Sequence, residues 1–219
     1  MSNQNKEKKG ANKKDDFKIN FWNSIKAKIL LLVFGAILLT VLLNLWTVIP
    51  RVSSNISDIT SNYIVDIATV AGEGIDNEIR MSSYDSIMTT GNLKRLIGNV
   101  AIKNVDGSYS YIVDADGTML YHPTAEKIGK SVENAVVKEV VAKLKSGDRP
   151  KPEVIEYTFN GQKKYAGIYV GKNKEFVMVV NAEKTEIMSG LTSIVSAIVK
   201  GSIFALIVFL LFLYLSQDI

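Results

Sequence analysis

Tyrosine is the residue type in this chain that is best suited to build a binding site. Six of the nine tyrosines, Tyr121 among them, fall between residues 109 and 169. Aromatic faces can line an apolar pocket while the hydroxyl groups bind a polar ligand, as small-molecule sites require. Tyr165 and Tyr169 should share one face of a strand, and Tyr111 could lie opposite them. Plain core packing is the alternative interpretation of these tyrosines.

Two cations are candidates for holding an anionic ligand. Arg95 and Lys164 could each pair with a ligand carboxylate, and arginine suits a bidentate pair better. The alternative for each is an ordinary surface cation that binds nothing specific. Together with the tyrosines, Arg95 and Lys164 predict a carboxylate or an amino acid as the small-molecule ligand. On this hypothesis, Tyr169→Ala or Arg95→Ala weakens ligand binding without unfolding the domain.

Asp114 and Asp116 stand in an Asp-Ala-Asp-Gly stretch that could serve as paired carboxylates or as a calcium loop. A calcium loop of this type needs a bidentate Glu at its twelfth position, and that position is Ala125. Aspartate before glycine also favours a tight turn. We therefore expect a turn here and no metal site.

The composition excludes several functional classes. The 219 residues include no Cys and one His, so a disulfide framework, a thiol nucleophile and a multi-histidine metal site are not expected. The sequence contains no nucleophile–base pair, phosphate-binding glycine loop or basic patch with interleaved aromatics. We expect no enzyme activity, no cofactor and no nucleic-acid partner. Hydrophobic residues make up 47% beside 22% charged residues, which indicates that the two kinds are segregated along the chain.

Two apolar runs predict transmembrane helices. Residues 29–49 form an apolar run that at about 1.5 Å per residue would cross a bilayer, and it ends without a good signal-peptide cleavage site. The second run is 201–215, and extension back to residue 191 brings it to full length with Lys200 near one end. The interpretation is two uncleaved spans, 29–49 and 191–215.

The charges flanking the first span predict the orientation. Residues 1–28 carry eight Lys against three acidic residues, whereas residues 50–199 carry 17 Lys and Arg against 18 Asp and Glu. The positive-inside rule then places residues 1–28 in the cytoplasm as a basic tail. It places the domain 50–190 on the outer side of the plasma membrane or bacterial inner membrane. Residues 216–219 would begin a cytoplasmic connector, and we expect the chain to be a fragment of a longer receptor.

The domain 50–190 is predicted to be α+β. Residues 51–88 have the spacing of a long helix, with apolar positions from Val52 to Val70 forming a heptad-like seam suited to a homodimer. Strands are expected at 109–113, 118–121, 154–159, 162–170 and 176–181. A helix over 132–145, capped by Ser131, separates the second and third strands. This order predicts a five-stranded antiparallel sheet with helices on one side.

One stretch carries a resemblance to a known family. Residues 111–123 read Y-I-V-D-A-D-G-T-M-L-Y-H-P, and Ile128-Gly129-Lys130 follows. Between two membrane spans, this pattern resembles the single Cache domain, a PAS-like extracellular sensor of bacterial transmembrane receptors. Residues 176–180 resemble its final strand, and 215–219 resemble the start of a HAMP connector. The resemblance implies a ligand pocket beside His122, where a neutral imidazole could donate to the ligand; a capping or loop-packing role is the alternative for His122.

The leading hypothesis is the sensory part of a chemoreceptor, most often a methyl-accepting chemotaxis protein in this family. Ligand binding would shift the last strand and, through it, the second membrane helix. The output could instead be a histidine kinase or a cyclic-dinucleotide enzyme. A different class of function, an extracellular protein-interaction module with an unoccupied pocket, also stays open.

Overall fold

The computed structural model describes residues 25–215, which form two units. One unit contains residues 25–45 and 202–215, and the other contains residues 46–201. Most of the predicted basic tail, residues 1–24, and the predicted connector, residues 216–219, lie outside the described residues.

Two helices of the described chain are long and apolar enough to cross a membrane. They are α1 (Ile25–Met81) and α6 (Ser189–Leu215), with mean hydropathies of 2.6 and 2.5 over their apolar windows. Within α1, the Thr40 hydroxyl donates to the Ala36 carbonyl at 2.8 Å, and the Asn44 amide donates to the Thr40 carbonyl at 2.8 Å. Thr40 and Asn44, two polar side chains of the first apolar run, therefore bond to their own helix, which is how a helix satisfies such groups in an apolar surrounding.

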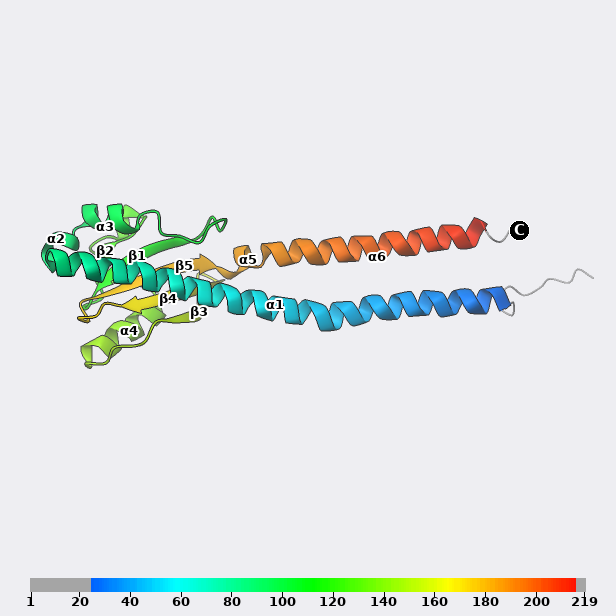
Figure 1. Ribbon diagram of the computed structural model, residues 1–219, viewed down its shortest axis with the longest axis horizontal. Helices are drawn as coiled ribbons and strands as arrows, with labels where there is room; N and C mark the ends of the chain where they lie inside the picture. The colour runs from blue at the N-terminus through cyan, green and yellow to red at the C-terminus, as the bar shows by residue number, and fades with distance from the viewer. Residues whose placement is uncertain (1–24, 216–219) are drawn as a thin grey trace, which may run out of the picture. The chain divides into compact units, whose positions relative to one another are not determined.

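Five antiparallel strands form one sheet in the order β2-β1-β5-β4-β3 (Figure 1). Their bounds are β1 (Tyr109–Asp114), β2 (Met119–Tyr121), β3 (Glu153–Phe159), β4 (Gln162–Val170) and β5 (Phe176–Glu183). The predicted α+β fold with a long N-terminal helix and a five-stranded antiparallel sheet is confirmed. Asn160 and Gly161, with φ of 51° and 77°, make the two-residue turn between β3 and β4, as their residue types predict.

Helices cover both faces of this sheet, so the prediction of helices on one side is wrong. One face packs against α1 with α2 (Tyr84–Ile87) and α3 (Thr90–Ile97), and the other packs against α4 (Ala135–Lys145). We name these the α1 face and the α4 face. The central strand β5 is buried along nearly its whole length. A continuous apolar strand of this kind is typical of burial on both faces, and the sequence interpretation overlooked it.

Two glycines bring α1 close to the sheet. A Cβ atom on Gly72 would lie 2.1 Å from the Tyr169 ring, and one on Gly167 would lie 2.4 Å from the Ile64 side chain and 2.8 Å from its carbonyl oxygen. Any larger residue would push the helix away from β4. Helix α1 continues unbroken through Gly72, where the missing side chain allows the close approach to Tyr169.

Two helix ends differ from the prediction. The helix expected over 51–88 ends at Met81, because Ser83 adopts an extended conformation and its hydroxyl caps α2. Asn134, not Ser131, is the N-cap of α4, and its side chain accepts from the Val136 N–H at 3.0 Å. The last strand connects to α6 through the short helix α5 (Lys184–Ile187).

Candidate functional site: a cavity on the α4 face

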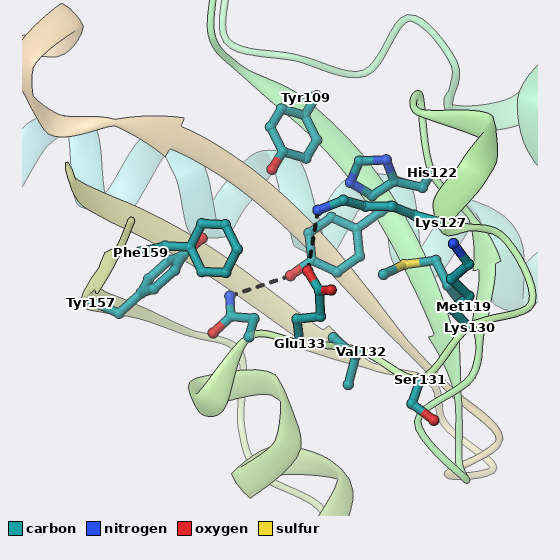
Figure 2. Close-up of a pocket in the computed structure, with 12 residues that line it drawn as sticks. Tyr109, Met119, His122, Lys127, Lys130, Ser131, Val132, Glu133, Tyr157 and Phe159 are labelled. Atoms are coloured by element: carbon teal, nitrogen blue, oxygen red, sulfur yellow. Dashed lines mark hydrogen bonds and ion pairs between the residues drawn. The ribbon is translucent and has the colours of Figure 1, made fainter. Parts of the chain in front are cut away.

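A cavity of about 50 Å³ opens on the α4 face of the sheet (Figure 2). This volume is several times the roughly 10–15 Å³ that one water molecule needs. Strands β1 and β3, the end of β2 and the segment before α4 contribute its walls. The lining residues are Tyr109, Tyr111, Met119, His122, Lys127, Lys130, Ser131, Val132, Glu133, Asn134, Tyr157 and Phe159.

Three aromatic rings form one wall of the cavity. The His122 ring lies 5.2 Å from the Tyr109 ring in an edge-to-face arrangement and 5.6 Å from the Tyr111 ring, measured between centroids. Tyr109 and Tyr111 are two residues apart on β1, so the pleat directs both to the same face. His122 directly follows β2, the neighbour of β1 in the sheet.

His122 is neutral and presents one N–H. Its Nδ1 atom accepts a hydrogen bond from the Thr124 N–H at 2.9 Å, so the ring proton of the neutral form lies on Nε2. Burial, with a smaller contribution from the Lys127 charge, lowers the pKa of His122 to about 4. An uncharged donor at physiological pH is the form that the sequence interpretation proposed for this imidazole.

The Tyr111 and Tyr157 hydroxyls at the cavity are neutral as well. The Tyr157 hydroxyl donates to Asn181 Oδ1 at 2.7 Å, and the Tyr111 hydroxyl accepts from Asn134 Nδ2 at 3.4 Å. Burial raises the pKa of both tyrosines far above the usual value. These groups can therefore exchange hydrogen bonds with a polar ligand, but they do not supply charge.

The charged residues of the lining are Lys127, Lys130 and Glu133. Lys127 ends the short helix η2 (Ala125–Lys127), and Glu133 immediately precedes the cap of α4. The Lys127 Nζ lies 3.5 Å from a carboxylate oxygen of Glu133 and 5.6 Å from the centre of the Phe159 ring. Figure 2 shows the Lys127 and Glu133 side chains pointing toward each other across the cavity. With two lysines against one glutamate, the lining carries a net positive charge.

The Asp114 turn positions this wall. Its carboxylate accepts hydrogen bonds from the Asp116 N–H at 2.9 Å and the Thr118 N–H at 2.8 Å, while Gly117 adopts a φ of +89°. The turn predicted from Asp-x-Asp-Gly is confirmed, and it reverses the chain from β1 into β2. Within residues 25–215, no cluster of three or more His, Asp or Glu side chains could hold a metal ion.

Two of the predicted site residues, Tyr111 and His122, line the cavity. Lys164 points to the same face of the sheet but forms an ion pair with Glu183 at 3.1 Å outside the lining. Arg95 is exposed on α3 and is also absent from the lining.

The other three predicted residues lie in the core of the α1 face: Tyr121, Tyr165 and Tyr169. The Tyr165 hydroxyl lies 2.7 Å from the Ser57 hydroxyl, and the Tyr169 hydroxyl donates to Asp76 at 2.6 Å. Both partners stand on α1. Tyr165 and Tyr169 share a strand face as predicted, but Tyr111 lies on the other face of the sheet, so these three tyrosines do not face one common pocket. The cavity lies on the Tyr111 side.

Several lining residues were missed from the sequence. Tyr109 could have been found, because it stands two residues before Tyr111 on one strand. Lys127, Lys130 and Glu133 lie in an irregular segment without a periodic pattern. That segment is held by backbone hydrogen bonds from Met119 and to Gly117, which connect it to β2 and to the turn preceding it.

Comparison with family models gave no match, and comparison with curated proteins gave none. Several solved structures are similar in fold. The ligand-binding domain of Mlp24 with asparagine shares 14% identity over 47% of this chain, with a TM-score of 0.34. The periplasmic sensory domain of the Campylobacter jejuni chemoreceptor Tlp1 shares 20% over 45%, with a TM-score of 0.36. A Cache chemosensory domain that recognises carboxylic acids shares 18% over 58%, with a TM-score of 0.42.

The extent of these matches differs. This chain spans 38% of the Mlp24 structure and 36% of the Tlp1 structure, but 93% of the Cache chemosensory domain. These neighbours are ligand-binding and sensory domains. With identities of 20% or less and TM-scores below 0.5 they carry no argument about this chain, so its function is argued below from its own residues.

Proposed function

We propose that this chain is the sensory and membrane-spanning part of a transmembrane chemoreceptor. The cavity on the α4 face binds a small carboxylate or amino acid outside the cytoplasm, and the signal passes through α6. Residues 191–215 of α6 and residues 29–49 of α1 are the two spans, with the N-terminus in the cytoplasm. The domain acts by binding and carries out no catalysis.

One observation carries this proposal: residues that line the cavity pair with, or hydrogen-bond to, β5, the strand that leads to α6. Tyr109 and Tyr111 of β1 pair with Asn181 and Val179 of β5. Asn181 is 1% exposed and accepts the hydrogen bond from Tyr157 at the cavity wall. A ligand that moves these tyrosines therefore acts on β5 only a few residues before α5 and α6 begin. Binding has an effect if it favours one of two positions of β5.

A matched pair of tyrosine variants tests the binding step. The full chain in detergent is screened by thermal shift against small carboxylates and amino acids, and hits are measured by calorimetry. Tyr111→Phe removes a buried hydroxyl at the cavity, and Tyr165→Phe removes one on the α1 face. We expect only Tyr111→Phe to weaken ligand binding, by roughly the tenfold that one hydrogen bond is worth. Equal affinities in both variants would refute the site, and capture of a protein partner without any ligand hit would favour an interaction module.

We propose further that the receptor is a homodimer joined along α1. Ile59, Tyr63 and Val70 leave 70%, 47% and 71% of their surfaces exposed, although they belong to the heptad-like seam. Exposed apolar residues at this spacing favour a second helix of the same kind. Because the chain has no native Cys, Ile59→Cys should form an intermolecular disulfide rapidly under mild oxidation, and the exposed neighbour Asp58→Cys should not.

Topology is tested separately. Protease added to intact cells should cleave the domain 50–190 and leave a tag on the N-terminus intact. Protection of the domain would reverse the proposed orientation.

A further inference from the structure

We infer that Glu133 is a built-in competitor for the anionic group of the ligand. Its carboxylate engages Lys127 in the structure, and a ligand carboxylate must displace it to reach that cation. This inference rests on the proposed function and concerns the regulation of the same site.

The first step is the charge inventory of the cavity. Of the twelve lining residues, only Lys127, Lys130 and Glu133 are of charged types apart from His122, which burial keeps neutral. A carboxylate ligand therefore depends on the lysines for its ion pair. One of the two already faces a carboxylate supplied by the protein, with 3.5 Å between Lys127 Nζ and Glu133 Oε2.

The second step is the way the two residues are held. The neighbours of Glu133 are fixed: Val132 donates its N–H to the Gly117 carbonyl at 2.8 Å, and Asn134 caps α4. Both of these neighbours are buried, at 3% and 7% exposure. The backbone of Glu133 thus stays at the cavity, and only its side chain is free to leave.

The third step is the strength of the ion pair. The Lys127 and Glu133 side chains are 38% and 68% exposed, and pairs at such positions contribute little to stability because water screens them. A ligand can therefore open the pair at small cost. After displacement, the Phe159 ring still lies 5.6 Å from Lys127 Nζ and can keep the cation in the cavity.

The alternative role for Glu133 is to bind the ammonium group of an amino acid directly. The two roles predict opposite effects of Glu133→Gln. A competitor lowers the affinity for an anion, so its removal strengthens binding. A direct ligand raises the affinity for an amino acid, so its removal weakens binding.

The experiment measures propionate and L-alanine, which differ by one ammonium group, on the full chain in detergent by calorimetry. We expect Glu133→Gln to bind propionate roughly threefold to tenfold tighter than the unchanged protein, since it frees a partly exposed ion pair and removes one like charge. Glu139→Gln is the matched control, because Glu139 is also an exposed, lysine-paired glutamate but lies on α4 outside the lining. It should leave the affinity for propionate unchanged.

A double-mutant cycle separates competition from general charge effects. In a Lys127→Gln background, most of the gain from Glu133→Gln should disappear, because the cation in dispute is absent. A full gain in that background overturns the inference, as does unchanged or weaker propionate binding in Glu133→Gln. Weaker L-alanine binding together with unchanged propionate binding assigns Glu133 to the ammonium group instead.

The failure of the inference is distinguishable from the failure of the proposed function. If neither the unchanged protein nor Glu133→Gln binds propionate, the inference is overturned. The proposed function then depends on the wider screen. It stands if the protein binds any other small molecule and Tyr111→Phe weakens that binding.

Discussion

The two faces of the sheet use the same residue type in different ways. On the α1 face, buried tyrosines direct their hydroxyls at side chains of α1, as Tyr169 does with Asp76 and Tyr165 with Ser57. On the α4 face, Tyr109, Tyr111 and Tyr157 surround a cavity. Tyrosine content alone therefore does not identify a binding site. The distinction depends on whether a helix fills the space above the ring.

The α1 face is packed for stability, and truncation there should have the largest effect. Tyr169→Ala removes a side chain that is 2% exposed, so we expect the free energy of unfolding to fall by about 3–5 kcal/mol. Urea unfolding of the full chain in detergent, followed by circular dichroism, measures this loss. The structure thereby changes the expectation that Tyr169→Ala leaves the fold intact.

Two variants make this comparison specific. Tyr109→Ala at the half-buried cavity wall should cost less, about 1–2 kcal/mol. Tyr169→Phe, which keeps the ring, should leave ligand affinity unchanged. A loss of affinity in Tyr169→Phe would mean that the two faces are coupled more tightly than their separate cores indicate.

The close approach of α1 provides the second prediction. Gly72→Ala places a methyl group where the Tyr169 ring lies, and overpacking of this kind costs about 1–3 kcal/mol. Gly74→Ala, two residues along the same helix, meets nothing within 4 Å and should stabilise by about 0.5–1 kcal/mol. Opposite signs in urea unfolding check the packing directly. Equal effects would indicate that α1 does not press on β4 at Gly72.

The third prediction concerns pH and belongs to the α4 face. The pKa of His122 is lowered to about 4 from an ordinary value of 6.5, so between these values the unfolded chain binds more protons than the folded one. Stability should therefore fall as pH decreases from 7 toward 4, by about 2 kcal/mol at pH 5. His122 is the only histidine in the chain. The free energy of unfolding is therefore measured against pH for the unchanged protein and for His122→Gln, and the difference between the two curves isolates this contribution. The absence of a difference would mean that the imidazole is solvated and takes no part in a closed wall.

The regular parts of the domain could be predicted because their signals are local. Alternation marks β3, Asn160-Gly161 specifies the turn that pairs it with β4, and Asp114 specifies the turn before β2. The cavity could not be predicted in the same way. Its charged residues stand in the irregular segment between β2 and α4, which is positioned by backbone hydrogen bonds to residues 117 and 119. Strand alternation places Tyr165 and Tyr169 on one face, but it does not relate that face to Tyr111 on another strand, and the helix packing shows which face is filled.

The smallest expected effect is the most direct test of what the α4 face is for. Glu133→Gln breaks the Lys127 ion pair, yet both side chains are partly exposed, and such pairs contribute about 0–1 kcal/mol. We expect the free energy of unfolding to change by no more than about 0.5 kcal/mol, as for Glu139→Gln. A loss above about 1.5 kcal/mol would make the pair a structural contact, and the α4 face would then be built for stability like the α1 face. If stability is unchanged while propionate affinity rises, the charges at the cavity affect binding and contribute little to folding. Asp76 has the opposite role, since its carboxylate accepts the hydrogen bond of a core tyrosine, Tyr169.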